Sequence, residues 1–223
     1  AGKDSIRVSG KDSVQFALRV YPGNADTATA KSYIEYVYTL KGKDYMIGYK
    51  VNFVGMRGYI AQNTRDMSLL WNTTLIQQEK SLKTEQTQST IHYMDVAGEV
   101  DYLSETKDEK ERISTAVKWV SFKQQFFSAT LIAGDKFESA DIETIGYPDN
   151  NTDRQVKTMR SAYILPFNID GDQSYNLQWY FGPNKYKVLR QYGMNLERQI
   201  PLGWSFFLMQ WINRFAVIPV FNW

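Results

Sequence analysis

The sequence predicts a mainly β protein built as an antiparallel β-sandwich. Fifteen Tyr, six Trp and twelve Phe make the composition rich in residues that suit a pleated, half-buried surface. From Ser5 to about Trp179, apolar and polar residues alternate with period two, and turn signals recur roughly every ten to fifteen residues. No helical pattern stands out between these segments, which favours an antiparallel sandwich over βαβ units.

The alternation places the strands in order along the chain. The first predicted strand, 14–20, ends at the turn signal Tyr21-Pro22-Gly23-Asn24. Strands 33–40 and 45–54 are joined by a short polar loop with a glycine, the spacing of a β-hairpin. Further strands are expected at 67–76, 90–94, 98–103, 117–122, 124–132, 137–145, 155–165 and 175–181. The charge run 105–112 is expected to be a solvated loop or a short helical turn.

The pattern becomes helical after Gly182. Pro183 suits the first turn of a helix, residues 185–192 repeat their apolar positions at helical spacing, and 196–200 add another turn. We therefore expect three parts: a β-sandwich domain at 1–182, truncated at its N-terminus; a short helical segment at 183–200, packed on the sandwich; and an amphipathic helix at 201–223. We also expect the chain to be an excised fragment of a longer protein.

The last predicted helix has an unusually aromatic face. On a helix with ~100° per residue, one half of the circumference carries the polar residues Ser205, Gln210, Asn213 and Arg214. The apolar half carries Trp204, Phe207, Leu208, Trp211, Ile212, Phe215 and Ile218. Such a face can pack in a core, in a partner's groove or on a bilayer. The stretch falls short of the ~20 apolar residues that span a membrane. We predict that its apolar residues lie at a membrane interface.

Composition excludes several functions. A net charge of +2 with no basic block gives no case for nucleic-acid binding. The absence of Cys excludes disulfides, zinc sites with thiolate ligands and thiol catalysis. His92 is the only histidine, which leaves multi-histidine metal centres and Ser-His-Asp triads without support. We expect His92 to be structural or to face solvent.

The carboxylates give only weak signals of chemistry. Glu99 with Asp101, and Asp141 with Glu143, are spaced to share a strand face, as in a glycosidase pair, but alternating surface charge explains them as well. An ordinary turn explains Asp170-Gly171-Asp172 as well as a Ca²⁺ site does. We predict no catalytic, cofactor-binding or metal-binding residue, and we predict that the chain is not an enzyme.

Four stretches together resemble YidC-type membrane protein insertases. Residues 119–127 (WVSFKQQFF) resemble the W-x(4)-Q-x-[FY]-F stretch of their large periplasmic domain, and Trp71 followed by Glu79-Lys80 and Glu85 resembles the W…EK…E segment of Bacteroidota-like members. Residues 180–185 (YFGPNK) are similar to the [YF]-x-G-P-K signature that closes the sandwich, although Asn184 interrupts it. Residues 202–212 are similar to the segment that enters the interfacial helix before the second membrane span. The structural motif residues are then Trp119, Gln125, Phe127, Gly182 and Pro183.

The resemblance implies a β-super-sandwich similar to sugar-mutarotase folds, with C-terminal α-helices. It implies a periplasmic domain of an inner-membrane protein that assists insertion and folding of membrane proteins, alone or with the Sec translocon. The expected partners are membrane protein clients, Sec components and the membrane surface, and no cofactor is expected. The family's hydrophilic groove and its key Arg lie in membrane spans outside this chain, so no catalytic residue is carried over.

Two other interpretations stay open at this point. One is a carbohydrate-binding or mutarotase-like sandwich in which Tyr33, Tyr36, Tyr38 and Trp71 stack on sugars, although aromatic residues that simply fill a β core are the plainer account. The other is a structural interaction module whose terminal helix packs on its own sandwich.

Overall fold

The computed structural model describes residues 6–23, 29–148 and 150–200. The chain divides into two compact units, Ala1–Pro183 and Asn184–Trp223, which are described separately below. No helix within the described ranges is long and apolar enough to cross a membrane. The predicted membrane-interface residues, from Trp204 to Ile218, lie outside the described residues.

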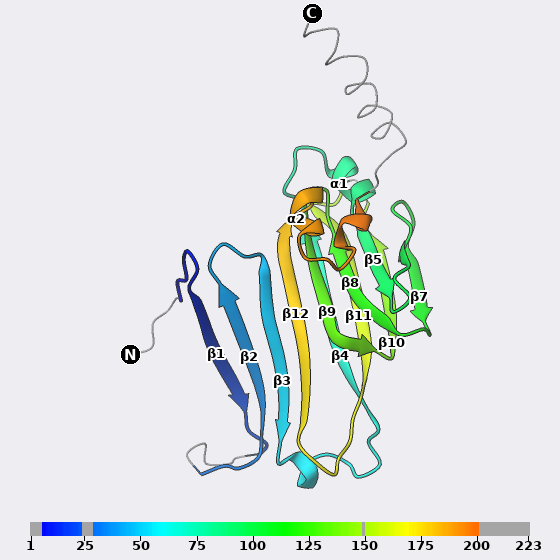
Figure 1. Ribbon diagram of the computed structural model, residues 1–223. Helices are drawn as coiled ribbons and strands as arrows, with labels where there is room; N and C mark the ends of the chain where they lie inside the picture. Colours follow the sequence, from blue (N-terminus) through cyan, green and yellow to red (C-terminus); the bar gives the residue numbers. More distant parts are fainter. Residues whose placement is uncertain (1–5, 24–28, 149, 201–223) are drawn as a thin grey trace, which may run out of the picture. The chain divides into compact units, whose positions relative to one another are not determined.

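The first unit is a sandwich of two antiparallel sheets (Figure 1). The larger sheet has eight strands, in the spatial order β1 (Ser13–Val20), β2 (Tyr33–Lys41), β3 (Met46–Val54), β12 (Gln173–Pro183), β9 (Phe127–Phe137), β8 (Val117–Lys123), β5 (Thr90–Asp95) and β6 (Val100–Tyr102). The smaller sheet has four, in the order β4 (Asp66–Ile76), β11 (Gln155–Pro166), β10 (Ser139–Gly146) and β7 (Glu109–Ile113). The predicted mainly β, antiparallel fold is confirmed.

Inward-facing side chains of both sheets form the core. Phe122, Val120 and Leu131 from the larger sheet and Met159 and Tyr163 from the smaller one are all fully buried in one cluster. Along β8 the core residues Val120 and Phe122 alternate with Trp119 and Ser121, as a period of two requires. Because Trp119 and Ser121 are also fully buried, β8 is buried on both faces, in agreement with the apolar character from which this strand is predicted.

The smaller sheet covers only part of the larger one. Its edge strand β4 lies over β12 and β8, because Trp71 stacks on Phe122 with ring centroids 3.6 Å apart and meets Trp179 at 4.7 Å. At the other edge, Glu111 of β7 accepts a hydrogen bond from Tyr93 of β5. Strands β1, β2 and β3 therefore project beyond β4, as the blue strands in Figure 1 show.

The predicted hairpin is confirmed, since β2 and β3 pair antiparallel from Tyr33↔Val54 to Leu40↔Ile47. The prediction for residues 105–112 is wrong from Glu109 onward. Residues 109–113 form the edge strand β7, which pairs with β10 so that Arg112 faces Asp141 and Lys110 faces Glu143. An edge strand with one solvated face tolerates such charges, so a charge run did not exclude a strand.

The absence of helices between the strands is also a wrong expectation. Helix α1 (Leu82–Gln88) follows β4, and its N-cap Ser81 accepts a hydrogen bond from the Thr84 amide at 3.2 Å. A short 3₁₀ turn, η1 (Met56–Gly58), follows β3. In the second unit, α2 (Tyr186–Arg190) and the 3₁₀ turn η2 (Leu196–Gln199) form where helical spacing was seen, and both are short.

Candidate functional site

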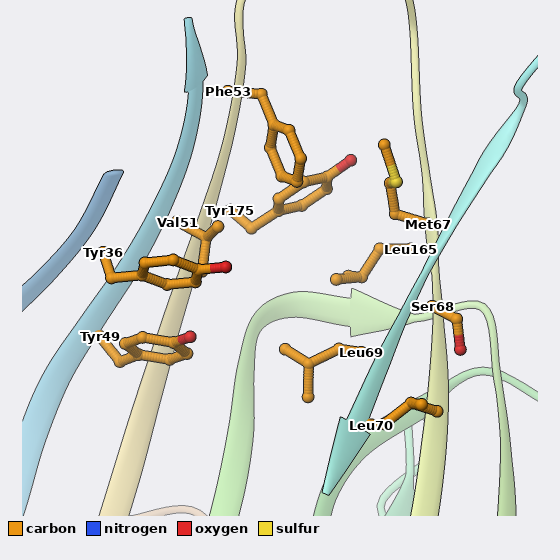
Figure 2. Close-up of a pocket in the computed structure, with 10 residues that line it drawn as sticks. All are labelled: Tyr36, Tyr49, Val51, Phe53, Met67, Ser68, Leu69, Leu70, Leu165 and Tyr175. Carbon is orange, nitrogen blue, oxygen red and sulfur yellow. The ribbon is translucent and has the colours of Figure 1, made fainter. Parts of the chain in front are cut away.

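An open groove lies between the two sheets beside β4, where β2 and β3 project past the smaller sheet. Its volume is about 290 Å³, at the lower end of the ~300–1,000 Å³ of small-molecule sites. Figure 2 shows Tyr36, Tyr49 and Tyr175 pointing into this space from the larger sheet, with Leu69 and Leu165 across from them. The lining has no charged side chain; it consists of Tyr36, Tyr49, Val51, Phe53, Met67, Ser68, Leu69, Leu70, Leu165 and Tyr175.

The floor of the groove continues as a row of aromatic rings across the projecting strands. Phe16 on β1 stacks on Tyr38 of β2 at 5.0 Å, Tyr38 stacks on Tyr49 of β3 at 5.1 Å, and Tyr49 meets Trp179 of β12 at 6.2 Å. Such pairs contribute roughly 0.5–1.5 kcal/mol each beyond their buried area. The row gives these strands an aromatic face that the smaller sheet does not cover.

The hydroxyls of Tyr49 and Tyr175 in the groove stay neutral. Burial raises the pKa of Tyr49, and the neighbouring Tyr38 and Tyr36 hydroxyls raise it further. Burial also raises the pKa of Tyr175, helped by the nearby Asp66 carboxylate, while the Tyr175 hydroxyl donates to the Pro166 carbonyl at 2.7 Å. A neutral, uncharged lining suits an apolar occupant and would penalise a charged one.

The wall of the groove is a free strand edge. Within the described residues, β4 pairs with β11 alone, over the register Asp66↔Pro166 to Ile76↔Gln155. In an antiparallel pair every second residue directs its backbone N–H and C=O away from the partner. Because β4 has eleven residues, a row of donors and acceptors lies along the groove.

The structure places the four aromatic residues of the carbohydrate hypothesis at three different sites. Trp71 belongs to the packed core through its stack on Phe122. Tyr36 and Tyr38 are half-buried on the aromatic face, and Tyr33 lies near Tyr21 and under the Arg19 guanidinium, 4.4 Å from its ring centre. The sequence does not single out Tyr49, Met67 and Leu69 as groove residues, because their alternation predicts a buried face and does not reveal where the opposite sheet ends.

His92 is buried in β5 and stacks on Tyr102 at 5.0 Å. Neither ring nitrogen has a hydrogen-bond partner among the described residues. Burial lowers the pKa of His92 to about 3, and the Lys123 ammonium adds to that effect. The ring is therefore neutral at physiological pH and has a structural position.

Asp141 and Glu143 lie on β10 with ordinary partners, whereas Glu99 lies in the turn before β6 and does not share a strand with Asp101. Glu143 accepts from Arg160 at 3.1 Å, and Asp141 faces Arg112 across the strand pair. Asp172 accepts the Gly55 amide at 2.9 Å, as a turn residue does. Among the residues that the structure describes, no three acidic or histidine side chains converge as a metal site.

Two lysines are buried beside the C-terminal end of α1. Lys123 Nζ donates to the Gln88 carbonyl at 3.0 Å, and Lys157 Nζ donates to the Ser89 and Glu105 carbonyls at 2.7 and 2.8 Å. Burial lowers the pKa of Lys157 to about 8 and also lowers that of Lys123. Cations suit the carbonyls at a helix C-terminus, so both lysines fix α1 to the sandwich. Their isolated positions in the sequence give no signal of burial.

The residues of the W-x(4)-Q-x-[FY]-F and [YF]-x-G-P-K motifs lie in strands β8, β9 and β12 and in the turn between β8 and β9. Trp119 on β8 is fully buried, while Phe127, the first residue of β9, is 59% exposed. Gln125 lies in the turn between those strands, with its Oε1 buried and unpartnered in the described structure. A side chain at Gly182 would place Cβ 2.5 Å from Tyr180 Oη, which itself donates to the Pro183 carbonyl at 2.8 Å. Glycine at 182 is therefore required by close packing.

The W…EK…E segment fixes the loop between β4 and α1. Glu85 is 2% exposed, and its carboxylate accepts the backbone amides of Gln78 at 3.0 Å and of Glu79 at 3.1 Å. The Glu85 carboxylate thus accepts hydrogen bonds from loop amides that a neighbouring strand would accept in a sheet. This explains why the segment needs an acid six residues after Glu79.

A family model supplies the decisive comparison: the YidC periplasmic domain matches residues 9–215. The chain belongs to the YidC periplasmic domain family. Relatives named membrane protein insertase YidC agree with this. The protein from Parabacteroides distasonis is 34% identical over 96% of this chain, and that from Azobacteroides pseudotrichonymphae is 32% identical over 86%. The protein from Cytophaga hutchinsonii is 30% identical over 98%.

This member of the YidC periplasmic domain family spans about a third of each relative's length: 34%, 32% and 36% of these three proteins. The resemblance stated from the sequence motifs is thereby confirmed. The family match does not favour a carbohydrate-binding or mutarotase-like function.

Proposed function

We propose that this chain is the periplasmic domain of an inner-membrane protein insertase, and that it assists the insertion and folding of membrane proteins, alone or with the Sec translocon. The observation that carries the proposal is the match to the YidC periplasmic domain over residues 9–215. Relatives that bear the name membrane protein insertase at 30–34% identity support it.

The proposed role is non-enzymatic. The groove has an apolar and hydroxylic lining with no charged group, and burial raises the pKa values of Tyr49 and Tyr175. The one histidine is buried with a pKa of about 3, which leaves it unable to act as a base or acid near neutral pH. The groove and the buried histidine therefore support a binding role and give no support to acid–base catalysis.

The domain's contact with the bilayer is assigned to residues 201–223. Their proposed interfacial position rests on the sequence alone, with Trp204, Phe207, Leu208, Trp211, Ile212, Phe215 and Ile218 on one half of a predicted helix. Trp is preferred at headgroup depth, and an aromatic face of this kind favours the interface over the bilayer centre. The segment would connect the sandwich to the membrane-embedded part of the insertase.

Co-purification tests the proposal. The full-length protein, tagged and solubilised from its own membranes, should retain ribosome-bound nascent chains of a polytopic membrane protein and Sec components. Ribosomes that carry a nascent soluble protein serve as the matched control. Equal recovery of both kinds of nascent chain would contradict the proposed function.

A further inference from the structure

The strand edge β4 and the uncovered aromatic face of β2 and β3 together form an incomplete sandwich. The larger sheet has eight strands and the smaller has four, so β1, β2 and part of β3 extend past the smaller sheet. The side chains Tyr36, Tyr38 and Tyr49 on this face remain only half-buried. One more strand added at β4 would lie over them, because neighbouring strands are ~4.8 Å apart and packed sheets ~10 Å apart.

We propose that the groove binds a single extended, apolar polypeptide segment that adds to β4 as a fifth strand of the smaller sheet. The segment would lie along Asp66–Leu70, where the groove opens, and every second side chain would point onto the aromatic row. This inference rests on the proposed function: the segment would belong to a membrane protein client that has not yet entered the bilayer.

The edge itself indicates a partner. Proteins protect free edges with charges, proline, bulges or short length, because an open edge pairs with other chains. The other three edges follow this rule: β6 has three residues, β7 reads EKERI, and β1 carries Arg19 in an ion pair with Glu35 at 2.8 Å. By contrast, β4 is eleven residues long and has no charge after Asp66.

The chemistry of the two surfaces selects a polypeptide with alternating apolar residues. Only a polypeptide backbone supplies donors and acceptors at the two-residue repeat that a strand edge presents, the mode known as β-augmentation. The groove volume of about 290 Å³ has room for a few side chains. With no charged group in the lining, a charged side chain directed inward would lose its hydration without a partner.

A second copy of this chain fits the same edge poorly. If two β4 strands paired antiparallel, both larger sheets would lie on the same side of the joined smaller sheets. The projecting strands β1, β2 and β3 of each copy would then occupy the space of the other copy's larger sheet (Figure 1). A single strand meets no such obstruction.

Peptide binding to the 223-residue chain tests the inference. The probe is a fluorescein-labelled nonapeptide of alternating Val and Thr with a Lys at each end, followed by fluorescence anisotropy. The matched control is the same peptide N-methylated at alternate residues, which keeps the side chains and removes the edge-facing amides. We expect saturable binding of the first peptide and at least ~10-fold weaker binding of the second, as follows from the loss of several hydrogen bonds.

Two variants and one exchange measurement locate the site. Met67→Lys, which places a charge in the groove, should weaken binding of the apolar peptide at least ~10-fold. Asn72→Lys, on the exposed face of the same strand, should leave it unchanged. The bound peptide should protect β4 amides from hydrogen exchange. Thermal melting of both variants shows that each is folded.

Several outcomes would overturn the inference. They are the absence of saturable binding, equal binding of the N-methylated peptide, or protection at β1 instead of β4. Sedimentation velocity that shows a dimer, with β4 protected without peptide, would make a second copy the occupant. If peptide binding fails while full-length protein still retains nascent membrane proteins, the inference fails and the proposed function stands. If the peptide binds at β4 but the full-length protein recovers nascent membrane and soluble proteins equally, the peptide site stands and the proposed function fails.

Discussion

Burial without hydrogen-bond partners sets the protonation state of His92. The ring lies in β5 with both nitrogens unpaired among the described residues, and its stack on Tyr102 provides contact but no acceptor. A buried polar group without a hydrogen-bond partner lowers the free energy of unfolding, because it loses its hydrogen bonds to water on folding and gains none in the protein. The apolar ring of Phe would fit the same stack and lack that cost.

His92→Phe should therefore be at least as stable as the wild type at pH 7 and should resist acid better. In the wild type, burial lowers the pKa of His92 to about 3, against about 6.5 in the unfolded chain. The unfolded state takes up the proton first, so stability is lost as pH falls from 6.5 towards 3, by up to about 1.4 kcal/mol per pH unit. Urea denaturation at several pH values measures the difference between the two proteins.

The matched control for this prediction is Tyr102→Phe, which keeps His92 and an aromatic ring beside it. That variant should retain the wild-type acid dependence. Profiles of unfolding free energy against pH that run parallel for His92→Phe and the wild type would show that His92 does not titrate as the buried position requires.

The sequence showed some residue roles and concealed others. A lone histidine in a strand-like segment pointed to a structural or solvent-facing position, and the structure shows that it is buried. The burial of Lys123 and Lys157 could not be foreseen, because it depends on the carbonyls of α1, which are far from either lysine in sequence. Similarly, the lining of the groove depends on where β4 ends the smaller sheet.

At the scale of elements, α1 and the preceding loop form one unit held by Glu85. The carboxylate accepts two loop amides and is itself almost fully buried. The helix has seven residues, too short to be stable alone. The loop, helix and buried lysines therefore depend on each other.

Glu85→Ala should open this loop. Loss of the carboxylate removes the hydrogen-bond acceptor of the partly buried amides of Gln78 and Glu79, and roughly 1–3 kcal/mol is the upper limit of the cost for each, because water can reach them in part. We expect a lower unfolding free energy and faster hydrogen exchange at these two amides. Lys83→Ala, on the exposed side of the same helix, is the matched control and should change neither. Unchanged exchange at Gln78 and Glu79 in Glu85→Ala would refute the role.

The elements that sequence reasoning misjudged share a physical cause. Strand β7 reads EKERI, yet β10 supplies opposite charges across it, so pairing that is remote in sequence outweighed a polar composition. Helix α1 is shorter than the window over which helical periodicity can be recognised. Strands with one buried face, such as β2 and β3, were predicted well because alternation is a local signal.

At the scale of the whole molecule, the proposed role requires contact with the bilayer. The predicted interfacial helix at 201–223 lies outside the described residues, so solution experiments must test it. Burying apolar surface contributes ~25 cal/mol per Å², and several Trp and Phe on one face give several kcal/mol as an upper bound.

Trp211→Glu should reduce flotation of the 223-residue chain with liposomes. The substitution puts a charge at the centre of the predicted apolar face, where an interfacial helix loses both burial and a preferred residue. Asn213→Glu, on the polar half of the same helix, is the matched control and should float like the wild type. Equal flotation of wild type and Trp211→Glu would remove the interfacial assignment.

The most direct test of the central claim is contact between this domain and a membrane protein during insertion. A photo-crosslinking amino acid at position 36, in the groove, is introduced into the full-length protein in its own membranes, with ribosomes stalled on a nascent membrane protein. We predict an adduct with that chain and none with a stalled soluble protein. No adduct with the membrane protein, at position 36 or at position 127 on the exposed start of β9, would contradict a role for this domain in insertion.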